Sequence, residues 1–256
     1  MDIHQRREKI LELLNENGQV KVAELSRLFE ISNITIRSDL ADLEEQGLLF
    51  RTHGGAINSY KSYCDMDLKQ RLSTNQKAKQ LISKEAASMI KEHDTIMLNS
   101  GTTTLSVFRA IPSQMKINIV TNSITIALEA SPNPNFNVVL LGGFINAKYQ
   151  FVYGDDAANQ LKNYHADKLF LSVDGVTAQN GLTTYYDRET EIARLMLSQS
   201  TKKIIVADAS KIGRTAFVNI ADSSKADYLI TEHAAADKDE LDKLKKKIRR
   251  IVTVRA

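Results

Sequence analysis

A short polar segment, Asn99-Ser100-Gly101-Thr102-Thr103-Thr104, lies where an apolar run ends and a helical pattern begins. The first N–H groups of a helix have no partner within it, and the helix dipole favours an anion at that end. Serine and threonine hydroxyls add further donors, so the segment predicts a phosphate cradle. It lacks the Gly-Lys-Ser/Thr ending of a P-loop, and nucleotide hydrolysis is therefore not indicated. A tight strand-to-helix turn capped by threonine remains the alternative.

Four further predicted strand ends carry polar groups that could line the same site. In an open parallel sheet, ligands bind in the crevice beyond the carboxyl ends of the strands. A phosphate cradle surrounded by carboxylate, amide and lysine groups suits a phosphorylated polyol or sugar, although each residue alone could be an ordinary loop residue. The four ends are Thr121-Asn122-Ser123, Gly142-Gly143, Asp174-Gly175 and Asp208-Ala209-Ser210-Lys211.

A second set of residues, near the start of the chain, could read DNA. Ser32 is a good N-cap for a helix that ends before Gly47 and that buries one apolar face. The opposite face is small and polar, which suits insertion into a major groove about 12 Å wide. Residues 51–56, Arg-Thr-His-Gly-Gly-Ala, then predict the turn of a short basic hairpin. The residues on the polar face are Asn33, Ile34, Arg37, Ser38 and Ala41.

Neither a catalytic nor a metal-ligating pattern accompanies these segments. Glu189 and Glu191 lie two residues apart on a predicted helix and point in different directions, which disfavours general acid–base catalysis by this pair of carboxylates. The 5 histidines have no metal-ligand spacing. Cys64 is the single cysteine, so an internal disulfide is excluded, and an incidental role is expected. We therefore expect no metal site and no cofactor.

The elements that must position these residues fall into three parts. Residues 1–57 predict three short helices and a hairpin, and residues 58–74 are polar without a sustained period, as in a linker. Residues 75–256 alternate helices with short apolar strands, which predicts an α/β domain with a mostly parallel sheet covered on both faces. The expected strands are 95–98, 117–121, 137–141, 168–173, 203–207, 228–231 and 249–254.

Charge and composition limit the kinds of partner that the chain can have. The chain has 256 residues, of which 43% are hydrophobic and 25% charged, and it has neither an apolar span for a membrane nor an export signal. A cytoplasmic protein without membrane association is therefore expected. Residues 1–60 hold seven basic and ten acidic side chains. The DNA-binding domain of one chain, which we call a head, should therefore bind DNA weakly. Higher affinity should require a homo-oligomer, a dimer or a tetramer, that presents more than one head. The basic stretch 237–256 is expected to be a solvated helix face.

The N-terminal motif resembles that of the DeoR family of bacterial transcriptional regulators, and the resemblance extends over nearly the whole chain. It implies a winged helix-turn-helix in residues 1–57. Ser38 stands where the family most often has a second arginine, which removes one phosphate or base contact and leaves the operator sequence open. The matching positions are Ile31 to Arg37, Asp39-Leu40, Leu43-Glu44, Gly47 and Arg51 to Ala56.

The C-terminal part resembles the effector domain of that family. The resemblance implies a fold similar to ribose 5-phosphate isomerase, glucosamine 6-phosphate deaminase and CoA-transferase-like proteins, and a role in oligomerisation for residues 75–256. Ala193 stands where the family has a lysine, so contacts from that helix are in doubt. The matching positions are Ser100 to Thr104, Thr121 to Ser123, Gly142-Gly143, Tyr153-Gly154, Asp174-Gly175, Gly181 to Thr184, Glu189, Asp208 to Lys211 and Gly213.

Three further segments resemble the branch of the family that regulates amino sugar and galactitol catabolism. They are Tyr153-Gly154-Asp155, Asn163-Tyr164-His165 and Asp167 to Val173.

The sequence thus predicts a repressor of a carbohydrate catabolism operon that is released or modulated by a phosphorylated sugar. Asn33, Ile34, Arg37 and Ser38 are expected to face base edges, and the remaining DNA-binding residues are Ser32, Thr35, Arg51, Thr52 and His53. The residues expected to bind the effector are Ser100, Gly101, Thr102, Thr103, Thr104, Asn122, Gly143, Tyr153, Asp174, Glu189 and Lys211.

Two alternatives stay open. The chain could be a sugar-phosphate isomerase or deaminase with an accessory DNA-binding head, in which Asp174 or Glu189 would act as a base. Against this, no histidine is placed beside these carboxylates for ring opening. Nonspecific DNA packaging is the other alternative, and it conflicts with the acidic first sixty residues.

Overall fold

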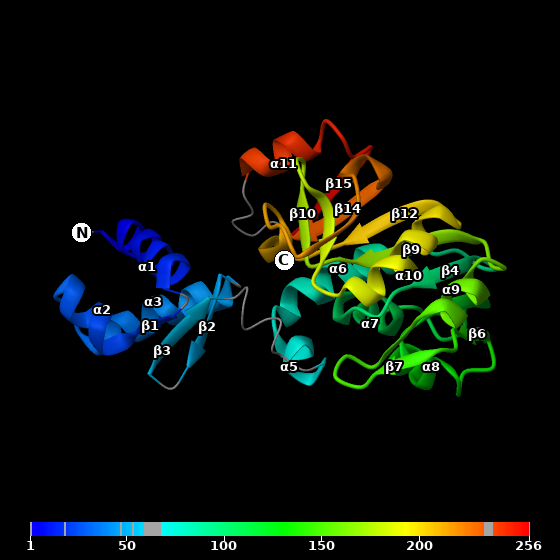
Figure 1. The fold of residues 1–256 in the computed structure, drawn as a ribbon, viewed down its shortest axis with the longest axis horizontal. Helices are drawn as coiled ribbons and strands as arrows, with labels where there is room; N and C mark the ends of the chain where they lie inside the picture. The colour runs from blue at the N-terminus through cyan, green and yellow to red at the C-terminus, as the bar shows by residue number, and fades with distance from the viewer. Residues whose placement is uncertain are drawn as a thin grey trace. The chain divides into compact units, whose positions relative to one another are not determined.

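The computed structural model describes residues 2–17, 19–46, 48–52, 54–58, 68–232 and 238–255. The chain forms two compact units, Met1–Asn75 and Gln76–Ala256, which we call the first and the second unit (Figure 1). Cys64 and His53 lie outside the described residues.

The first unit is a winged helix-turn-helix around a small apolar core. Its three strands form an antiparallel sheet in the order β1-β3-β2, and the hairpin of β2 and β3 is the predicted wing. Ile10, Leu14, Leu25 and Leu40 come from all three main helices and are buried together. The elements are α1 (Ile3–Asn17), β1 (Gln19–Lys21), α2 (Val22–Phe29), α3 (Asn33–Glu45), β2 (Leu49–Thr52) and β3 (Gly55–Asn58).

Helix α3 forms where the sequence predicted it, because its N-cap residue and the helical spacing of its apolar residues indicate the same segment. The Ser32 side chain accepts a hydrogen bond from the Thr35 backbone N–H at 3.1 Å, which satisfies one of the orphan donors of the first turn. Ile36, Leu40 and Leu43 follow at helical spacing and are buried. The expected helices of this unit are confirmed, whereas β1, with three residues, was not foreseen.

The second unit is built on a seven-stranded sheet in the order β15-β14-β12-β9-β4-β5-β6, and every neighbouring pair is parallel. The prediction of a mostly parallel sheet is thereby confirmed. The strands are β4 (Thr95–Leu98), β5 (Ile117–Thr121), β6 (Phe136–Leu140), β9 (Ala166–Ser172), β12 (Ser200–Val206), β14 (Tyr228–Glu232) and β15 (Arg250–Val254). The helices are α5 (Leu68–Ser73, in the expected linker), α6 (Gln76–Ser88), α7 (Thr102–Arg109), α8 (Ile124–Ala130), α9 (Asp155–Leu161), α10 (Asp187–Ser198) and α11 (Lys238–Leu244).

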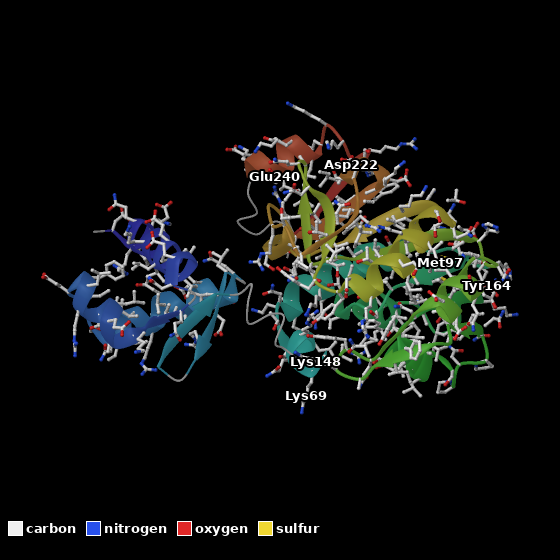
Figure 2. All side chains as sticks on the ribbon, viewed as in Figure 1. Lys69, Met97, Lys148, Tyr164, Asp222 and Glu240 are labelled. Atoms are coloured by element: carbon white, nitrogen blue, oxygen red, sulfur yellow. The ribbon has the colours of Figure 1, made fainter. Side chains whose placement is uncertain are left out.

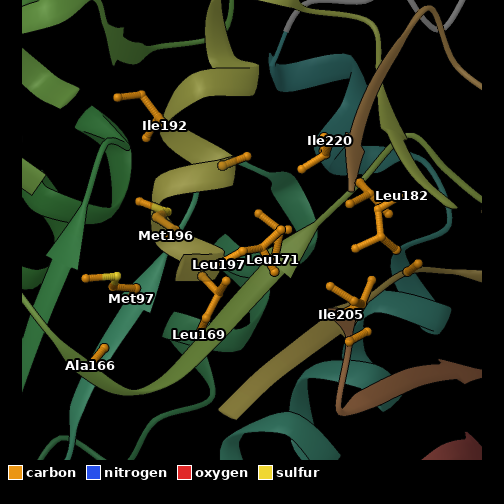
Figure 3. Close-up of a cluster of buried hydrophobic side chains, with 14 of the residues drawn as sticks. Met97, Ala166, Leu169, Leu171, Leu182, Ile192, Met196, Leu197, Ile205 and Ile220 are labelled. Atoms are coloured by element: carbon orange, nitrogen blue, oxygen red, sulfur yellow. The ribbon is translucent and has the colours of Figure 1, made fainter. Parts of the chain in front are cut away.

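Helices cover both faces of this sheet. Leu169 and Leu171 of β9 pack in one buried cluster with Ile192 and Met196 of α10 (Figure 3). Phe170, between the two leucines, is also buried, and α6 and α7 pack against the sheet as well. Side chains alternate between the faces of a strand, so a strand buried on both faces carries a continuous apolar run. This explains why the central strands could be located from the sequence.

Two small antiparallel sheets were not foreseen. Their strands are three or four residues long and lie in polar or glycine-containing segments that show no period. Gly181 begins one of them with φ +73°, and a Cβ there would lie 2.1 Å from the Ala221 carbonyl oxygen, so only glycine fits. The two sheets comprise β10 (Gly175–Thr177), β11 (Gly181–Thr184) and β13 (Val218–Ala221), and β7 (Phe144–Asn146) and β8 (Phe151–Tyr153).

Among the described ranges, none of the helices combines the length and apolarity required to span a bilayer.

Candidate functional site

The predicted DNA-facing side of α3 is open to solvent. Asn33, Arg37 and Ser38 are exposed, and the exposed fraction of Ile34 is 79%. Ile36 and Leu40 on the other side are buried. An exposed isoleucine among short polar side chains gives a surface that can meet thymine methyl groups as well as hydrogen-bonding base edges.

The acidic residues of α3 are held away from this surface by ion pairs. The Asp39 carboxylate is buried and accepts from Arg6 Nε at 2.6 Å and from Arg7 Nε at 3.1 Å. Arg7 also pairs with Asp42. The hydrogen bond to Asp39 is the main reason that the pKa of Arg6 is raised. These pairs engage basic as well as acidic side chains, so the net charge of the first sixty residues is unchanged, but neither carboxylate is paired with Arg37.

Arg37 is the cation on that face. Across the described residues its guanidinium makes no ion pair or hydrogen bond. Arg51 of the wing is engaged differently, because its Nε and its backbone N–H each lie 2.8 Å from a carboxylate oxygen of Glu44. The Thr35 hydroxyl lies 3.0 Å from that of Ser32. The side chain of Thr52 and all of His53 lie outside the described residues.

The second unit has a topological switch point between β4 and β9. Strand β4 continues through α7 to β5 on one side, whereas β9, on its other side, leads through α10 to β12. The connections that follow the two adjacent strands therefore leave in opposite directions, and ligands bind at such a point in open parallel sheets. Asn99 ties the two ends together: its Nδ2 donates to the Ser172 carbonyl at 3.0 Å, and its Oδ1 accepts from the Ser172 N–H at 2.9 Å.

The expected phosphate cradle begins α7 at this switch point. In the described structure the backbone N–H groups of Thr102, Thr103 and Thr104 make no hydrogen bond, as expected for a first helical turn. The Thr104 hydroxyl accepts from the Gly101 N–H at 2.9 Å. Close packing requires Gly101, because a Cβ there would lie 1.6 Å from Ser172 Oγ.

Two predicted carboxylates near the switch point have defined hydrogen-bond partners. A Glu189 oxygen lies within hydrogen-bond distance of the Ser100 hydroxyl, which joins α10 to the cradle. Asp174 is buried, and its Oδ2 accepts from the Thr184 hydroxyl at 3.1 Å and from the Tyr185 N–H at 3.0 Å. Both carboxylates are held in fixed positions at the carboxyl ends of the sheet, as binding groups require.

Asn122 and Tyr153 form a second group at this edge. Asn122 is fully buried at 0% exposure and donates to the Val152 carbonyl at 3.2 Å, while its Oδ1 has no hydrogen-bond partner within the described ranges. Gly143 lies beside Tyr153, because a Cβ on Gly143 would be 2.7 Å from the Tyr153 carbonyl oxygen. Tyr153 also meets Phe144 and Phe151, with ring centres 6.0 Å and 5.9 Å away.

Lys211 and Glu232 complete the edge beyond β9. Lys211 is buried in the short helix Ala209–Lys211 that follows β12. Glu232, at the end of β14, was missed by the sequence analysis. Its two carboxylate oxygens lie 3.0 Å and 2.9 Å from the Ala209 N–H. Burial, and next the charge of Asp208, raise the pKa of Glu232 to about 7.

Other charged clusters have structural partners. Glu240 and Asp222, labelled in Figure 2, pair with Lys243 at 3.3 Å and Lys247 at 2.8 Å, so part of the basic C-terminal stretch is neutralised locally. The described residues contain no group of three or more histidine, cysteine, aspartate or glutamate side chains that could hold a metal ion.

Comparison with known proteins identifies both units. Residues 6–61 match the DeoR-like helix-turn-helix domain, and residues 74–233 match the DeoR C terminal sensor domain. The chain belongs to the DeoR family. As a DeoR-family protein it is a DNA-binding transcriptional regulator, which confirms that part of the functional prediction.

Several DeoR-family relatives align along nearly their whole length. The chain is 34% identical to the HTH-type transcriptional regulator GolR of Listeria innocua, with 90% of each chain covered. It is 32% identical to the putative aga operon transcriptional repressor of Escherichia coli O157:H7, covering 94% of this chain and 90% of that one. It is 31% identical to the HTH-type transcriptional repressor GlcR of Bacillus subtilis, covering 87% and 86%. These names are those of regulators and not of enzymes, so the isomerase alternative is not supported.

Solved structures resemble part of the fold. Ribose 5-phosphate isomerase A from Methanocaldococcus jannaschii is similar with a TM-score of 0.40 and 17% identity over 54% of this chain and 55% of that one. The delta subunit of eIF2B from Chaetomium thermophilum is similar with a TM-score of 0.44 and 16% identity over 63% and 57%.

Proposed function

We propose that this DeoR-family regulator represses a carbohydrate catabolism operon, and that a phosphorylated sugar bound at the carboxyl ends of the parallel sheet weakens its hold on operator DNA. The names of relatives that regulate sugar operons support the operon class. The amino sugar and galactitol branch supplies our first candidates for the sugar.

The contact between Ser100 and Glu189 carries the effector proposal. It brings a hydroxyl of the α7 cradle and a carboxylate of α10 together at the switch point between β4 and β9. Backbone N–H groups of α7 suit a phosphoryl group, while carboxylates such as Asp174 and Glu189 suit sugar hydroxyls. One crevice therefore offers the two kinds of recognition that a phosphorylated sugar needs.

In the first unit, Arg37 and its exposed neighbours Asn33, Ile34 and Ser38 would read base edges. Phosphates would be contacted by Thr35, Arg51, Thr52 and His53, and Ser32 would lie beside them at the DNA interface. Arg51 can contact a phosphate only by sharing its guanidinium with Glu44. We further propose a division of labour along the chain. Residues 1–57 would bind DNA, and residues 58–74 would link this part to the rest of the chain. Residues 75–256 would bind the effector and hold the chains of the oligomer together. A homo-oligomer would raise affinity by presenting two heads at a fixed spacing.

The test is a titration of operator binding. A binding site is first selected from random duplex DNA by the full-length protein, and its affinity is then measured with galactosamine 6-phosphate, galactitol 1-phosphate and ribose 5-phosphate. We expect at least one phosphosugar to weaken operator binding by about 5- to 150-fold, the range of ordinary allosteric coupling. If none of them changes the affinity for operator DNA, the effector proposal fails, and only the proposal that the first unit recognises DNA remains.

A further inference from the structure

An exposed guanidinium stands in the first turn of α10. Arg188 Nη1 donates a hydrogen bond to the Tyr153 hydroxyl at 2.8 Å, and Arg188 Cζ lies 5.4 Å from the centre of the Tyr153 ring. Over the ranges that the structure describes, these are the contacts of this side chain, and no carboxylate pairs with it. Arg188 therefore carries an uncompensated positive charge in a defined orientation.

The position of Arg188 links the two halves of the crevice. Its neighbour Glu189 contacts Ser100 of the cradle. Its partner Tyr153 follows Val152, which exchanges hydrogen bonds with Asn122: the Val152 N–H donates to the Asn122 carbonyl at 2.8 Å, and Asn122 Nδ2 donates back at 3.2 Å. The guanidinium is thus tied to the β5 side of the proposed site through Tyr153, and the next residue of α10, Glu189, contacts the β4 side.

A phosphoryl group bound among the carboxylates of the proposed site would need a positively charged side chain beside it. Asp174, Glu189 and Asp208 are carboxylates that would repel a phosphate dianion, and Lys211 is the predicted cation among the effector residues. A guanidinium has five N–H donors in a planar fork that fits phosphate oxygens. The Tyr153 hydroxyl takes one donor, and the aromatic ring holds the group without neutralising it.

We propose that Arg188, held against Tyr153, binds the phosphoryl group of the effector and so selects phosphorylated sugars over free ones. This assignment rests on the effector site proposed above. The arrangement differs from that of an ordinary surface arginine, because stacking and a hydrogen bond to one tyrosine restrict the side chain before a ligand arrives, which lowers the entropic cost of binding.

The experiment measures binding of galactosamine 6-phosphate, galactitol 1-phosphate and the two unphosphorylated sugars by calorimetry. It compares the full-length wild type with Arg188→Gln, Arg188→Lys and Lys202→Gln. Lys202 is exposed near the amino end of β12, so its variant loses the same charge away from the crevice. We expect Arg188→Gln to bind the phosphorylated sugar about 10- to 100-fold more weakly. Arg188→Lys should lie in between, and binding of the free sugar and of operator DNA should be unchanged.

The outcomes separate the two proposals. If the wild type binds a phosphosugar and Arg188→Gln binds it equally well, the role of Arg188 is overturned while the effector site survives. Equal losses for phosphorylated and free sugar would also overturn it, since they would indicate a general disturbance of α10. If the wild type binds neither phosphosugar, the site itself is wrong for these ligands, and the assignment of Arg188 fails with it.

Discussion

At the scale of single residues, Arg37 is where DNA recognition is most directly tested. It is exposed on α3 beside Asn33 and Ser38, and it is not engaged by any carboxylate in the described chain. A guanidinium that reaches a guanine or a desolvated phosphate contributes a charge-assisted hydrogen bond. Arg37→Ala should therefore weaken operator binding by about 1 to 3 kcal/mol, measured by fluorescence anisotropy at fixed salt.

Lys9→Ala is the matched control, because Lys9 is an exposed α1 cation paired with Glu12 at 2.7 Å. The control should bind operator within error of the wild type. An unchanged affinity for Arg37→Ala would place this side chain in solvent rather than on DNA.

Asp39 should act on stability instead of recognition. Its buried carboxylate neutralises Arg6 and Arg7, and removing one member of a buried ion pair leaves uncompensated charge. Asp39→Asn should lower the free energy of unfolding of the first unit by about 3 to 5 kcal/mol in urea denaturation followed by circular dichroism. Glu16→Gln, at an exposed α1 position, should leave stability unchanged. Equal stability of the two variants would mean that the Asp39 cluster is not a structural ion pair.

Glu232 should make stability depend on pH. Its pKa is raised from 4.5 to about 7, chiefly by burial, so between these values the folded state binds more protons than the unfolded state. Its stabilising contribution is therefore complete below about pH 4.5 and is lost as the pH rises through about 7. Glu232→Gln keeps an acceptor for the Ala209 N–H but cannot titrate, so its free energy of unfolding should decline less than that of the wild type from pH 5 to 8.

Urea denaturation at pH 5, 6, 7 and 8 measures this difference, with Glu191→Gln on the exposed side of α10 as the control. Wild type and Glu232→Gln curves that run parallel across this range would contradict the assigned pKa shift.

At the scale of elements, the sequence predicts the positions of long apolar strands and of capped helices, but it does not reveal short strands. Helix α3 and the strands β4 and β5 were located closely, because Ser32 caps the helix and the strands are continuous apolar runs. Strand β1 and the hairpin β7-β8 have three residues per strand, too few to show a period, and their pairing is set by tertiary contacts. Pattern alone cannot assign such elements.

The site shows the same limit. Strand ends such as Ser100 and Asp174 could be predicted as neighbours, because parallel strands end at one edge. Glu232 and Arg188 could not, since each is an ordinary charged residue until the fold places it against Ala209 or Tyr153. The same holds for the packing of Gly101, because its closeness to Ser172 is seen only in the folded chain.

That close packing gives a prediction about α7 and β9. In Gly101→Ala the added methyl group would overlap Ser172, with 1.6 Å to its Oγ and 2.6 Å to its Cβ, so the first turn of α7 must shift. We expect a stability loss of about 1 to 3 kcal/mol in urea denaturation and weaker phosphosugar binding. Replacing Ser172 with glycine in the same chain should recover part of both losses. No recovery in the double variant would show that overlap with Ser172 is not the cause.

At the scale of the whole molecule, the internal ion pairs of the first unit leave its excess of acidic charge in place. Seven basic and ten acidic residues in the first sixty predicted a weak head. Asp39, Asp42 and Glu44 are paired with Arg6, Arg7 and Arg51, so the ion pairs engage acidic and basic side chains alike and the excess of acidic charge remains. A single Arg37 still offers few phosphate contacts, and pairing of heads remains the proposed source of affinity.

Control by a phosphosugar then requires that the ligand favour a state of the second unit in which the heads no longer fit the operator together. A ligand shifts such an equilibrium only by its difference in affinity for the two states. Linkage makes the effect reciprocal, so operator DNA must weaken phosphosugar binding by the same factor.

The most direct measurement is the dissociation constant of the full-length protein for its selected operator, with and without a saturating phosphosugar that it binds. We predict that the phosphosugar raises this constant by about 5- to 150-fold, and that the unphosphorylated sugar leaves it unchanged. An operator affinity that is the same with and without the bound phosphosugar would contradict the central claim that this ligand controls repression.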